Sequence, residues 1–380
     1  MGPVYITKTA SLLPNSAVTN DEMEDFLGII NNKSSRSKAM VLRNNKIKQR
    51  YYALKKGGET THSNAQLTSF AIKNLFDNNL KLIKEVDLLC CGTSSPDQIM
   101  PSHGLMVHGC LPEMKSIEVI TPSGNCCAGM HALKYAYLSL SSGDKNKAVC
   151  AGSERISQML KSQYFEQEIN YLNDLKSDAY LSFEKDFLRW MLSDGAGAFL
   201  LENKCPVDKQ SLKIEWIETV SFANTEETCM YMGAEKMKDG TLKGFSEYSP
   251  QDVADQSILS IKQDSKLLSN KIIELGFNKI PDIFKKHNIT GEEIDYFLVH
   301  MSSYFFEDKI AQYFEKIGIN LPKEKWFNTL SKIGNVGAGS IYLMVDELMK
   351  SGNLKKGNRL LLIVPESARF SYAYSLLTVC

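Results

Sequence analysis

The stretch GNCCAG, residues 124–129, returns in the second part of the chain as GNVGAG, residues 334–339. Each copy has an apolar strand-like run before it and a helical pattern, a Ser-Gly pair and a second apolar run after it. Paired features are separated by a nearly constant offset of about 210 residues. Features that repeat in one order at one offset indicate an internal duplication of a β–α–β unit.

Short apolar runs alternate with longer helical patterns, and this alternation predicts an α/β fold. The expected elements include a strand at 86–92 and helices at 63–76 and 127–140. The chain has 380 residues, enough for two packed halves, which we place at 1–205 and 206–380. Residues 154–190 interrupt the scheme with a long, aromatic-rich and helix-prone segment, which we interpret as an insertion in the first half.

Composition argues against several classes of partner. Lys plus Arg and Asp plus Glu both number 44, and this balance argues against a nucleic acid or an anionic membrane. No apolar run approaches the length of about 18 residues that spans a bilayer, and the N-terminus lacks a secretory signal pattern. The nine cysteines form no CxxC pair and only six histidines occur, so we expect no metal site. We expect a cytoplasmic protein with reduced thiols.

Two adjacent cysteines, Cys126 and Cys127, stand at the start of the helix expected at 127–140. Unpaired N–H groups and the helix dipole favour negative charge there, so a thiol in this place is expected to have a lowered pKa and to attack a thioester carbonyl. The local pattern does not decide which cysteine is the nucleophile, and two buried core thiols remain an alternative. A redox pair is disfavoured, because adjacent cysteines form a strained disulfide.

His300 and Asn335 are the candidate partners of that nucleophile. His300 ends an apolar run in the second half, and Asn335 lies in the repeat of the cysteine turn. Equivalent strand ends converge in a duplicated fold, so we expect both residues to face the cysteine turn. Together they would offer donors to a thioester oxygen on which negative charge develops. The alternatives are a structural histidine and an ordinary turn asparagine.

Several local patterns resemble the thiolase superfamily, most closely β-ketoacyl-acyl-carrier-protein synthase III. They are RNNKIKQR (43–50), DLLCCGTSSPD (87–97), CAGM (127–130), SDGAGA (193–198), VH (299–300) and GNVGAGS (334–340). The resemblance runs from about residue 4 to about residue 377. It implies a duplicated αβαβα five-layer fold, a homodimer, no bound cofactor, and substrates carried on coenzyme A or an acyl carrier protein.

The resemblance also implies residue roles. Cys127 would be the nucleophile, because the family's reactive cysteine is followed by Ala-Gly, and it would carry the acyl group. His300 and Asn335 would bind the carbonyl of a second thioester and stabilise its enolate, which in the family arises by decarboxylation of a malonyl thioester. Lys46, Lys48 and Arg50 match the family's carrier entrance; a solvated charged loop is the alternative.

The sequence departs from the family in three places. The family's glycine-rich C-terminal loop, which supplies an oxyanion-hole N–H, is replaced here by a segment that contains Glu366, Ser367, Ala368 and Arg369. Glu366, Ser367 and Ala368 are thus the candidates for that loop, which keeps its backbone N–H groups but loses the freedom of glycine. Glu366 is expected either to pair with Arg369 or to act as a base. Met-Ser-Ser follows His300 where the family has Gln-Ala-Asn, in the region that receives the pantetheine arm. Residues 154–190 exceed the family's segment, which lies near the acyl tunnel and the dimer partner.

These departures favour a divergent enzyme of secondary metabolism. We expect it to condense two acyl thioesters, one malonyl or β-ketoacyl, and possible products include a ring of the dialkylresorcinol or cyclohexanedione type. An acyltransferase or thioester hydrolase, which uses the same acyl-cysteine without forming a carbon–carbon bond, is the first alternative. A non-catalytic subunit that shapes a partner's tunnel is disfavoured, because Cys127, His300 and Asn335 are all present.

Overall fold

The computed structural model of this chain describes residues 2–30, 35, 37–77, 79, 81–165 and 187–380. Nine strands form one large sheet in the order β13-β14-β15-β8-β1-β7-β6-β4-β5. Their bounds are β1 (Tyr5–Leu12), β4 (Leu88–Gly92), β5 (Glu118–Ile120), β6 (Lys147–Glu154), β7 (Gly195–Glu202), β8 (Leu212–Ser221), β13 (Tyr296–Val299), β14 (Arg359–Glu366) and β15 (Ser371–Val379). Short strands lie outside it: β2 (Val18–Thr19) with β3 (Gln49–Arg50), β9 (Met230–Tyr231) with β12 (Lys262–Gln263), and β10 (Ala234–Lys236) with β11 (Leu242–Gly244).

The sheet repeats one topology twice. β4 is parallel to β6, and β7 is antiparallel to β6. In the same way β13 is parallel to β14, and β15 is antiparallel to β14. The two halves meet where β1 and β8 pair, through Tyr5–Lys213 and Ile6–Leu212. The predicted duplication is therefore visible in the order and direction of the strands.

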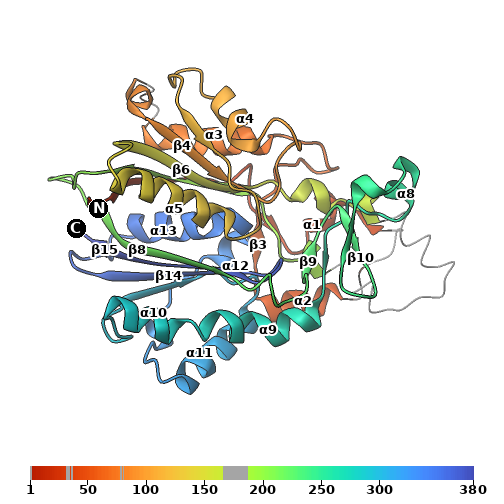
Figure 1. The fold of residues 1–380 in the computed structure, drawn as a ribbon. Helices are drawn as coiled ribbons and strands as arrows, with labels where there is room; N and C mark the ends of the chain where they lie inside the picture. The colour runs from red at the N-terminus through yellow and green to blue at the C-terminus, as the bar shows by residue number, and fades with distance from the viewer. Residues whose placement is uncertain (1, 31–34, 36, 78, 80, 166–186) are drawn as a thin grey trace.

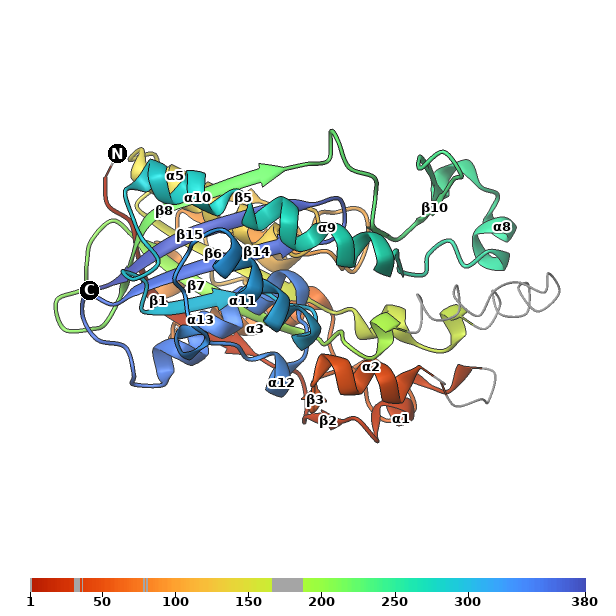
Figure 2. The ribbon, with the colours of Figure 1, turned by 90° about the horizontal axis from the view of Figure 1, so that it is seen from below.

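Helices separate and cover the two parts of the sheet (Figure 1). They are α1 (Met23–Leu27), α2 (Lys38–Asn45), α3 (Asn64–Leu75), α4 (His103–Gly109), α5 (Ala128–Ser141), α8 (Pro250–Asp255), α9 (Ser265–Phe277), α10 (Ile280–His287), α11 (Glu307–Lys316), α12 (Leu330–Ile333) and α13 (Ser340–Lys350). α5 and α13 lie between the sheet halves, and α3 and α4 cover the outer face of the first half (Figure 1). α9 to α11 cover the outer face of the second half, which is the side seen in Figure 2. The five-layer αβαβα prediction is confirmed.

The equivalent helices of the two halves touch at the centre of the molecule. Tyr342 of α13 stacks on Phe199 of β7, with ring centroids 4.2 Å apart, and its hydroxyl donates to the Gly129 carbonyl of α5 at 2.8 Å. These contacts bury a polar group with its hydrogen-bond partner, as a packed core requires. They bring the two GNxxAG turns, one before each helix, close together.

The elements predicted from periodicity are present with small shifts at their ends. Helix α3 begins after Ser63, whose side chain accepts the Gln66 N–H while Gln66 returns a bond to the Ser63 N–H, which is a capping box. The strand expected at 86–92 is β4, and the helix expected at 127–140 is α5, with Cys127 as its N-cap. Most of the insertion expected at 154–190 lies outside the described residues, since 166–186 are not described. No described helix is long and apolar enough to cross a membrane.

Candidate active site

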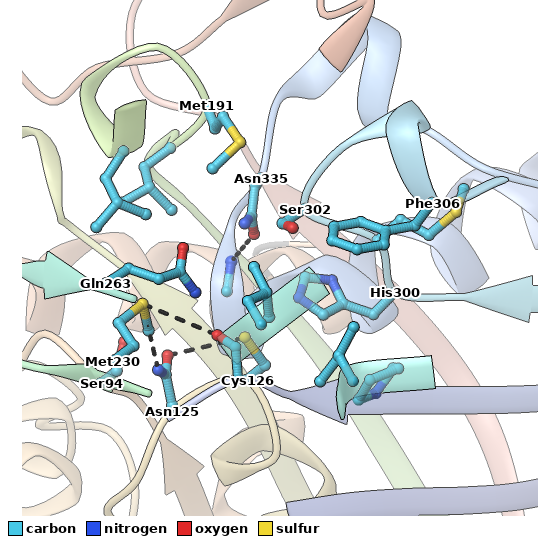
Figure 3. A pocket seen from close by; sticks show the side chains of 18 of the residues that line it. Ser94, Asn125, Cys126, Met191, Met230, Gln263, His300, Ser302, Phe306 and Asn335 are labelled. Atoms are coloured by element: carbon cyan, nitrogen blue, oxygen red, sulfur yellow. Dashed lines mark hydrogen bonds between the residues drawn. The ribbon is translucent and has the colours of Figure 1, made fainter. Parts of the chain in front are cut away.

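A buried pocket lies between the two halves, next to the start of α5 (Figure 3). It encloses about 810 Å³, including its opening to solvent. Its polar lining includes Asn125, Cys126, Glu154, His300, Asn335 and Ser367. Much of the remaining lining is apolar and includes Ile156, Met191, Leu268, Ile272, Phe277 and Phe306. A pocket that is apolar with a few converging polar groups is typical of a small-molecule site.

His300 follows strand β13 directly, and its N–H donates to the Ile363 carbonyl of β14 at 2.9 Å. The side chain is buried, and desolvation lowers its pKa to about 4. The imidazole is therefore neutral near neutral pH, with one ring nitrogen able to donate a hydrogen bond and the other able to accept one.

Asn335 is held by its own turn and by the first half of the chain. Its N–H donates to the Met191 carbonyl at 3.0 Å, and its carbonyl accepts the Ser193 N–H at 2.8 Å. Its side-chain Oδ1 accepts the Gly337 N–H at 2.9 Å, which fixes the plane of the amide. Asn335 and His300 therefore line the same pocket as the cysteine turn, as Figure 3 shows.

The two cysteines are placed differently. Cys126 lines the pocket and is 8% exposed, whereas Cys127 is fully buried and is not among the lining residues. The Cys127 thiol donates to the Val364 carbonyl at 3.2 Å. In this conformation Cys126, and not Cys127, presents its side chain to the pocket.

The predicted lowering of the cysteine pKa is wrong for this structure. Burial and the charge of Glu366 raise the pKa of Cys127 well above its usual value, and the pKa of Cys126 is raised in the same way. The main physical reason is burial, which disfavours the charged thiolate; the second is that the carboxylate of Glu366 already lies at the start of α5. Glu366 Oε2 accepts the N–H groups of Cys127 at 3.0 Å and of Asn125 at 3.2 Å. The N–H groups that would stabilise a thiolate therefore serve a carboxylate.

The replaced C-terminal loop also differs from expectation. Glu366 does not pair with Arg369, because its carboxylate turns inward to the start of α5 while Arg369 Nε donates to the Glu226 carbonyl at 3.1 Å. Ser367 lines the pocket. The Ala368 carbonyl accepts the N–H groups of Cys229 and Met230, so this residue anchors the loop to the segment around β9.

The three basic residues expected at a carrier entrance separate into two groups. Lys46 and Lys48 are exposed, and Lys46 Nζ lies 5.9 Å from the centre of the Tyr304 ring. Arg50 is fully buried, and its guanidinium donates to the Trp190 carbonyl at 2.8 Å and to Asn20 at 2.6 Å. Arg50 is thus a structural residue, and its assignment to the entrance was wrong, since a carrier protein cannot reach it.

Glu154 was missed by the sequence analysis. It ends strand β6, lines the pocket and is buried, and burial raises its pKa. Its carboxylate accepts the hydroxyls of Ser94 and Ser95 and the N–H of Ala338, beside the Asn335 turn. A charged residue two positions after the apolar run 148–152 was the available signal. Among the described residues, no group of three or more His, Cys, Asp or Glu side chains could hold a metal ion.

The fold and the pocket define a thiolase-like α/β protein with a site between its two duplicated halves. The profile of the family described as 3-oxoacyl-[acyl-carrier-protein (ACP)] synthase III C terminal matches residues 284–368. The chain is 22% identical over 371 residues to the β-ketoacyl-[acyl-carrier-protein] synthase III of Chlorobaculum tepidum, covering 94% of each chain.

Solved structures share the whole fold. AbyA1, described as a tetronic acid condensing enzyme, superposes with a TM-score of 0.75 at 19% identity and covers 99% of both chains. OleA of Xanthomonas campestris, with bound lauric acid and lauroyl-CoA, superposes with a TM-score of 0.73 at 17% identity and covers 99% of both chains. The chain is thus similar to β-ketoacyl-acyl-carrier-protein synthase III in sequence over nearly its whole length, and it shares the fold of the solved condensing enzyme AbyA1.

Proposed function

We propose that the chain is a condensing enzyme that carries an acyl group on Cys127 and joins it to the enolate of a second thioester. The observation that carries the proposal is the pocket itself. His300 and Asn335, from the second half, line it together with the cysteine turn of the first half. A neutral imidazole and a fixed carboxamide on one wall offer donors to the oxygen of an enolate, which is where negative charge develops in a Claisen condensation.

The reaction would run in two stages. An acyl thioester, on coenzyme A or an acyl carrier protein, first transfers its acyl group to the Cys127 sulfur. A second thioester then binds with its carbonyl at His300 and Asn335 and becomes an enolate, by loss of CO2 from a malonyl group or of an α-proton from a β-ketoacyl group to a base. The enolate carbon attacks the acyl carbon, the bond from that carbon to the Cys127 sulfur breaks, and the product stays on the second carrier while the cysteine is restored. The apolar lining from Ile156 and Met191 to Ile272 and Phe277 suits an alkyl chain.

Ring closure is the finer part of the proposal. We propose a product of the dialkylresorcinol or cyclohexanedione type, formed by a second condensation within the first product. The fold neighbour AbyA1 is described as a tetronic acid condensing enzyme, and this supports cyclisation by a protein of this shape. A second carbanion needs a base, and Glu366 is the candidate. Release of the cyclised product at full rate by Glu366→Gln would rule out that role.

The experiment that tests the proposal is intact-protein mass spectrometry after incubation with acetyl-, octanoyl- and lauroyl-coenzyme A and with the same acyl groups on an acyl carrier protein. Wild type should gain the mass of one acyl group, Cys127→Ala should not, and Cys126→Ala should. The variant pair matters because Cys126 faces the pocket while the Cys127 thiol contacts Val364. Loss of the adduct in Cys126→Ala alone would move the nucleophile to Cys126.

If no donor acylates the wild type, the condensing function is contradicted, and the tunnel-shaping subunit becomes the hypothesis to test. If the acyl-enzyme forms but yields only free acid or an ester, the alternative acyltransferase or hydrolase is supported. The proposal includes a homodimer, which analytical ultracentrifugation would show as a species of twice the 42.7 kDa chain mass.

A further inference from the structure

We propose that Glu366 is the acid–base residue of the acylation step: its carboxylate takes the proton of the Cys127 thiol and returns it to the carrier thiol that leaves. This inference rests on the proposed acyl-Cys127 intermediate and adds the group that moves its proton. It places the action of Glu366 before any ring closure, at the first bond that the enzyme makes.

The hydrogen bonds of Glu366 are made to the cysteine turn, and one of them is to Cys127 itself. Oε2 accepts the Cys127 N–H at 3.0 Å and the Asn125 N–H at 3.2 Å. Val364, two residues earlier in β14, accepts the Cys127 thiol at 3.2 Å. One strand end thus contacts both the amide and the thiol of Cys127.

The start of α5 can accommodate one negative charge more easily than two. Glu366 is 8% exposed, and among the described residues no cation pairs with it; its partners are the two N–H groups. Ionising the Cys127 thiol beside an ionised Glu366 would place two like charges together in a poorly solvated site, which is unfavourable. Moving the proton from sulfur to carboxylate keeps the charge at one.

Proton transfer to Glu366 also frees the Cys127 N–H to bind the oxygen of the tetrahedral intermediate. A neutral Glu366 binds the Cys127 N–H less strongly than a carboxylate does, because hydrogen bonds to ionised acceptors are the stronger ones. The N–H can then bind the oxygen of the tetrahedral intermediate, where the charge has moved. The single negative charge thus moves from the Glu366 carboxylate to the substrate oxygen, and no second negative charge forms in the site.

The step balances in atoms and charge. The S–H bond of Cys127 breaks and its proton goes to the Glu366 carboxylate, while a bond forms between sulfur and the thioester carbonyl carbon. When the intermediate collapses, the bond between carbonyl carbon and carrier sulfur breaks. The carrier thiolate takes the proton from Glu366. The products are acyl-Cys127, a carrier thiol and the restored carboxylate.

Other titratable groups packed around this pair are Cys126, Glu154, His300, Tyr372 and Tyr374. Burial lowers the pKa of His300 to about 4 and raises those of both tyrosines, so these three are neutral at neutral pH. Burial raises the pKa of Cys126, and Glu154 is engaged by Ser94, Ser95 and the Ala338 N–H. A pH profile that changes on substitution of Glu366, with these five residues left in place, reports on the Glu366–Cys127 pair.

The test is single-turnover acylation by octanoyl-coenzyme A, quenched rapidly and read as intact mass, from pH 5.5 to 9. Glu366→Gln keeps the size and an oxygen acceptor for the two N–H groups, but it cannot take a proton. At pH 7 its acylation rate should fall by about 100-fold or more, within the range of general acid–base catalysis. The acylation rate of Glu366→Gln should rise about tenfold per pH unit, as for a thiol that loses its proton to solvent. The wild-type acylation rate should instead reach a plateau as the pH rises.

A second readout separates acid–base chemistry from simple damage to the site. Alkylation of Cys127 by iodoacetamide needs the thiolate but no proton for the leaving iodide. Glu366→Gln removes a like charge, so alkylation should become faster at pH 7 while acylation becomes slower. A misfolded or closed site would slow both. Glu226→Gln, which removes a carboxylate paired with Lys271 outside the pocket, is the matched control and should acylate within twofold of wild type.

The outcomes separate the role of Glu366 from the proposed function. If Glu366→Gln acylates within threefold of wild type with an unchanged pH profile, Glu366 only caps the helix and the inference is wrong. If wild type is acylated at Cys127, this failure leaves the proposed function intact; if wild type is not acylated there, both fall. Should Glu366→Gln not fold, Glu366→Asp takes its place. It should keep the levelled profile at a lower rate, and a profile without that plateau would overturn the inference.

Discussion

Gly152 lies so close to Ala338 that a Cβ atom on Gly152 would be 2.2 Å from the Ala338 carbonyl oxygen. Gly129, at the start of α5, has the same relationship to that carbonyl, at 2.3 Å. Ala338 belongs to the short 3₁₀ helix η7 (Gly337–Gly339), which begins two residues after Asn335. The first half therefore supports the Asn335 turn by close backbone contact, which only residues without a side chain allow.

Gly152→Ala should displace the Asn335 turn. The added methyl cannot be accommodated at 2.2 Å, and the neighbour that must move is backbone. We expect a loss of about 1–3 kcal/mol in the free energy of unfolding, as for overpacked cores, and at least a tenfold loss of condensation. Denaturant titration and a product assay measure the two effects. Gly109→Ala is the control, because nothing lies within 4 Å of its Cβ position; equal stability of the two variants would contradict the argument.

Asn335→Asp should separate the two stages of the reaction. Aspartate keeps the oxygen that accepts the Gly337 N–H, but it loses the donor and adds a negative charge where the enolate oxygen would lie. Condensation should fall by about 100-fold or more, while acylation of Cys127 stays within a few-fold of wild type. Intact mass and product formation on the same sample measure both stages. Full condensation activity in Asn335→Asp would favour the acyltransferase or hydrolase alternative.

His300 should make folding stability depend on pH between about 6.5 and 4. Burial lowers its folded pKa from 6.5 to about 4, so in this window the unfolded chain binds a proton that the folded chain does not. The stability that depends on a neutral, buried His300 is therefore fully present above pH 6.5 and is lost as the pH falls towards 4. Relative to His300→Gln, the wild type should lose about 2 kcal/mol of stability between pH 7 and pH 5. Urea titrations at both pH values measure this difference, and parallel changes in the two proteins would show that His300 is not buried neutral.

The fold could be predicted because its signals are local and repeated. The two GNxxAG turns, the strands before them and the helices after them can each be read within about 15 residues, and the duplication then predicts that equivalent strand ends meet. This reasoning predicted that His300 and Asn335 lie close to the cysteine turn, and all three line the pocket.

The wrong predictions concern contacts between residues distant in sequence. The low cysteine pKa was expected from the helix start alone, whereas the carboxylate of Glu366, 241 residues from Asn125, occupies those N–H groups. Arg50 was assigned to the surface, whereas its guanidinium binds the Trp190 carbonyl, 140 residues away. Glu154 was overlooked because its partners are in other turns. Local pattern does not reveal which distant side chain satisfies a buried polar group.

Lys46 and Lys48 should distinguish an acyl carrier protein from coenzyme A as the acyl donor. Both are exposed, and an acidic carrier would gain most of its attraction from such charges, chiefly in the rate of association. Lys46→Glu/Lys48→Glu should raise KM for an octanoyl carrier protein by about tenfold at low salt, and the effect should shrink as salt screens the charges. KM for octanoyl-coenzyme A should change less than threefold. Lys356→Glu, exposed in the turn before β14, is the control for charge alone. An equal rise in KM for both donors would mean that these lysines bind a phosphate group that the two donors share, and no rise for either would mean that the charged loop is only solvated.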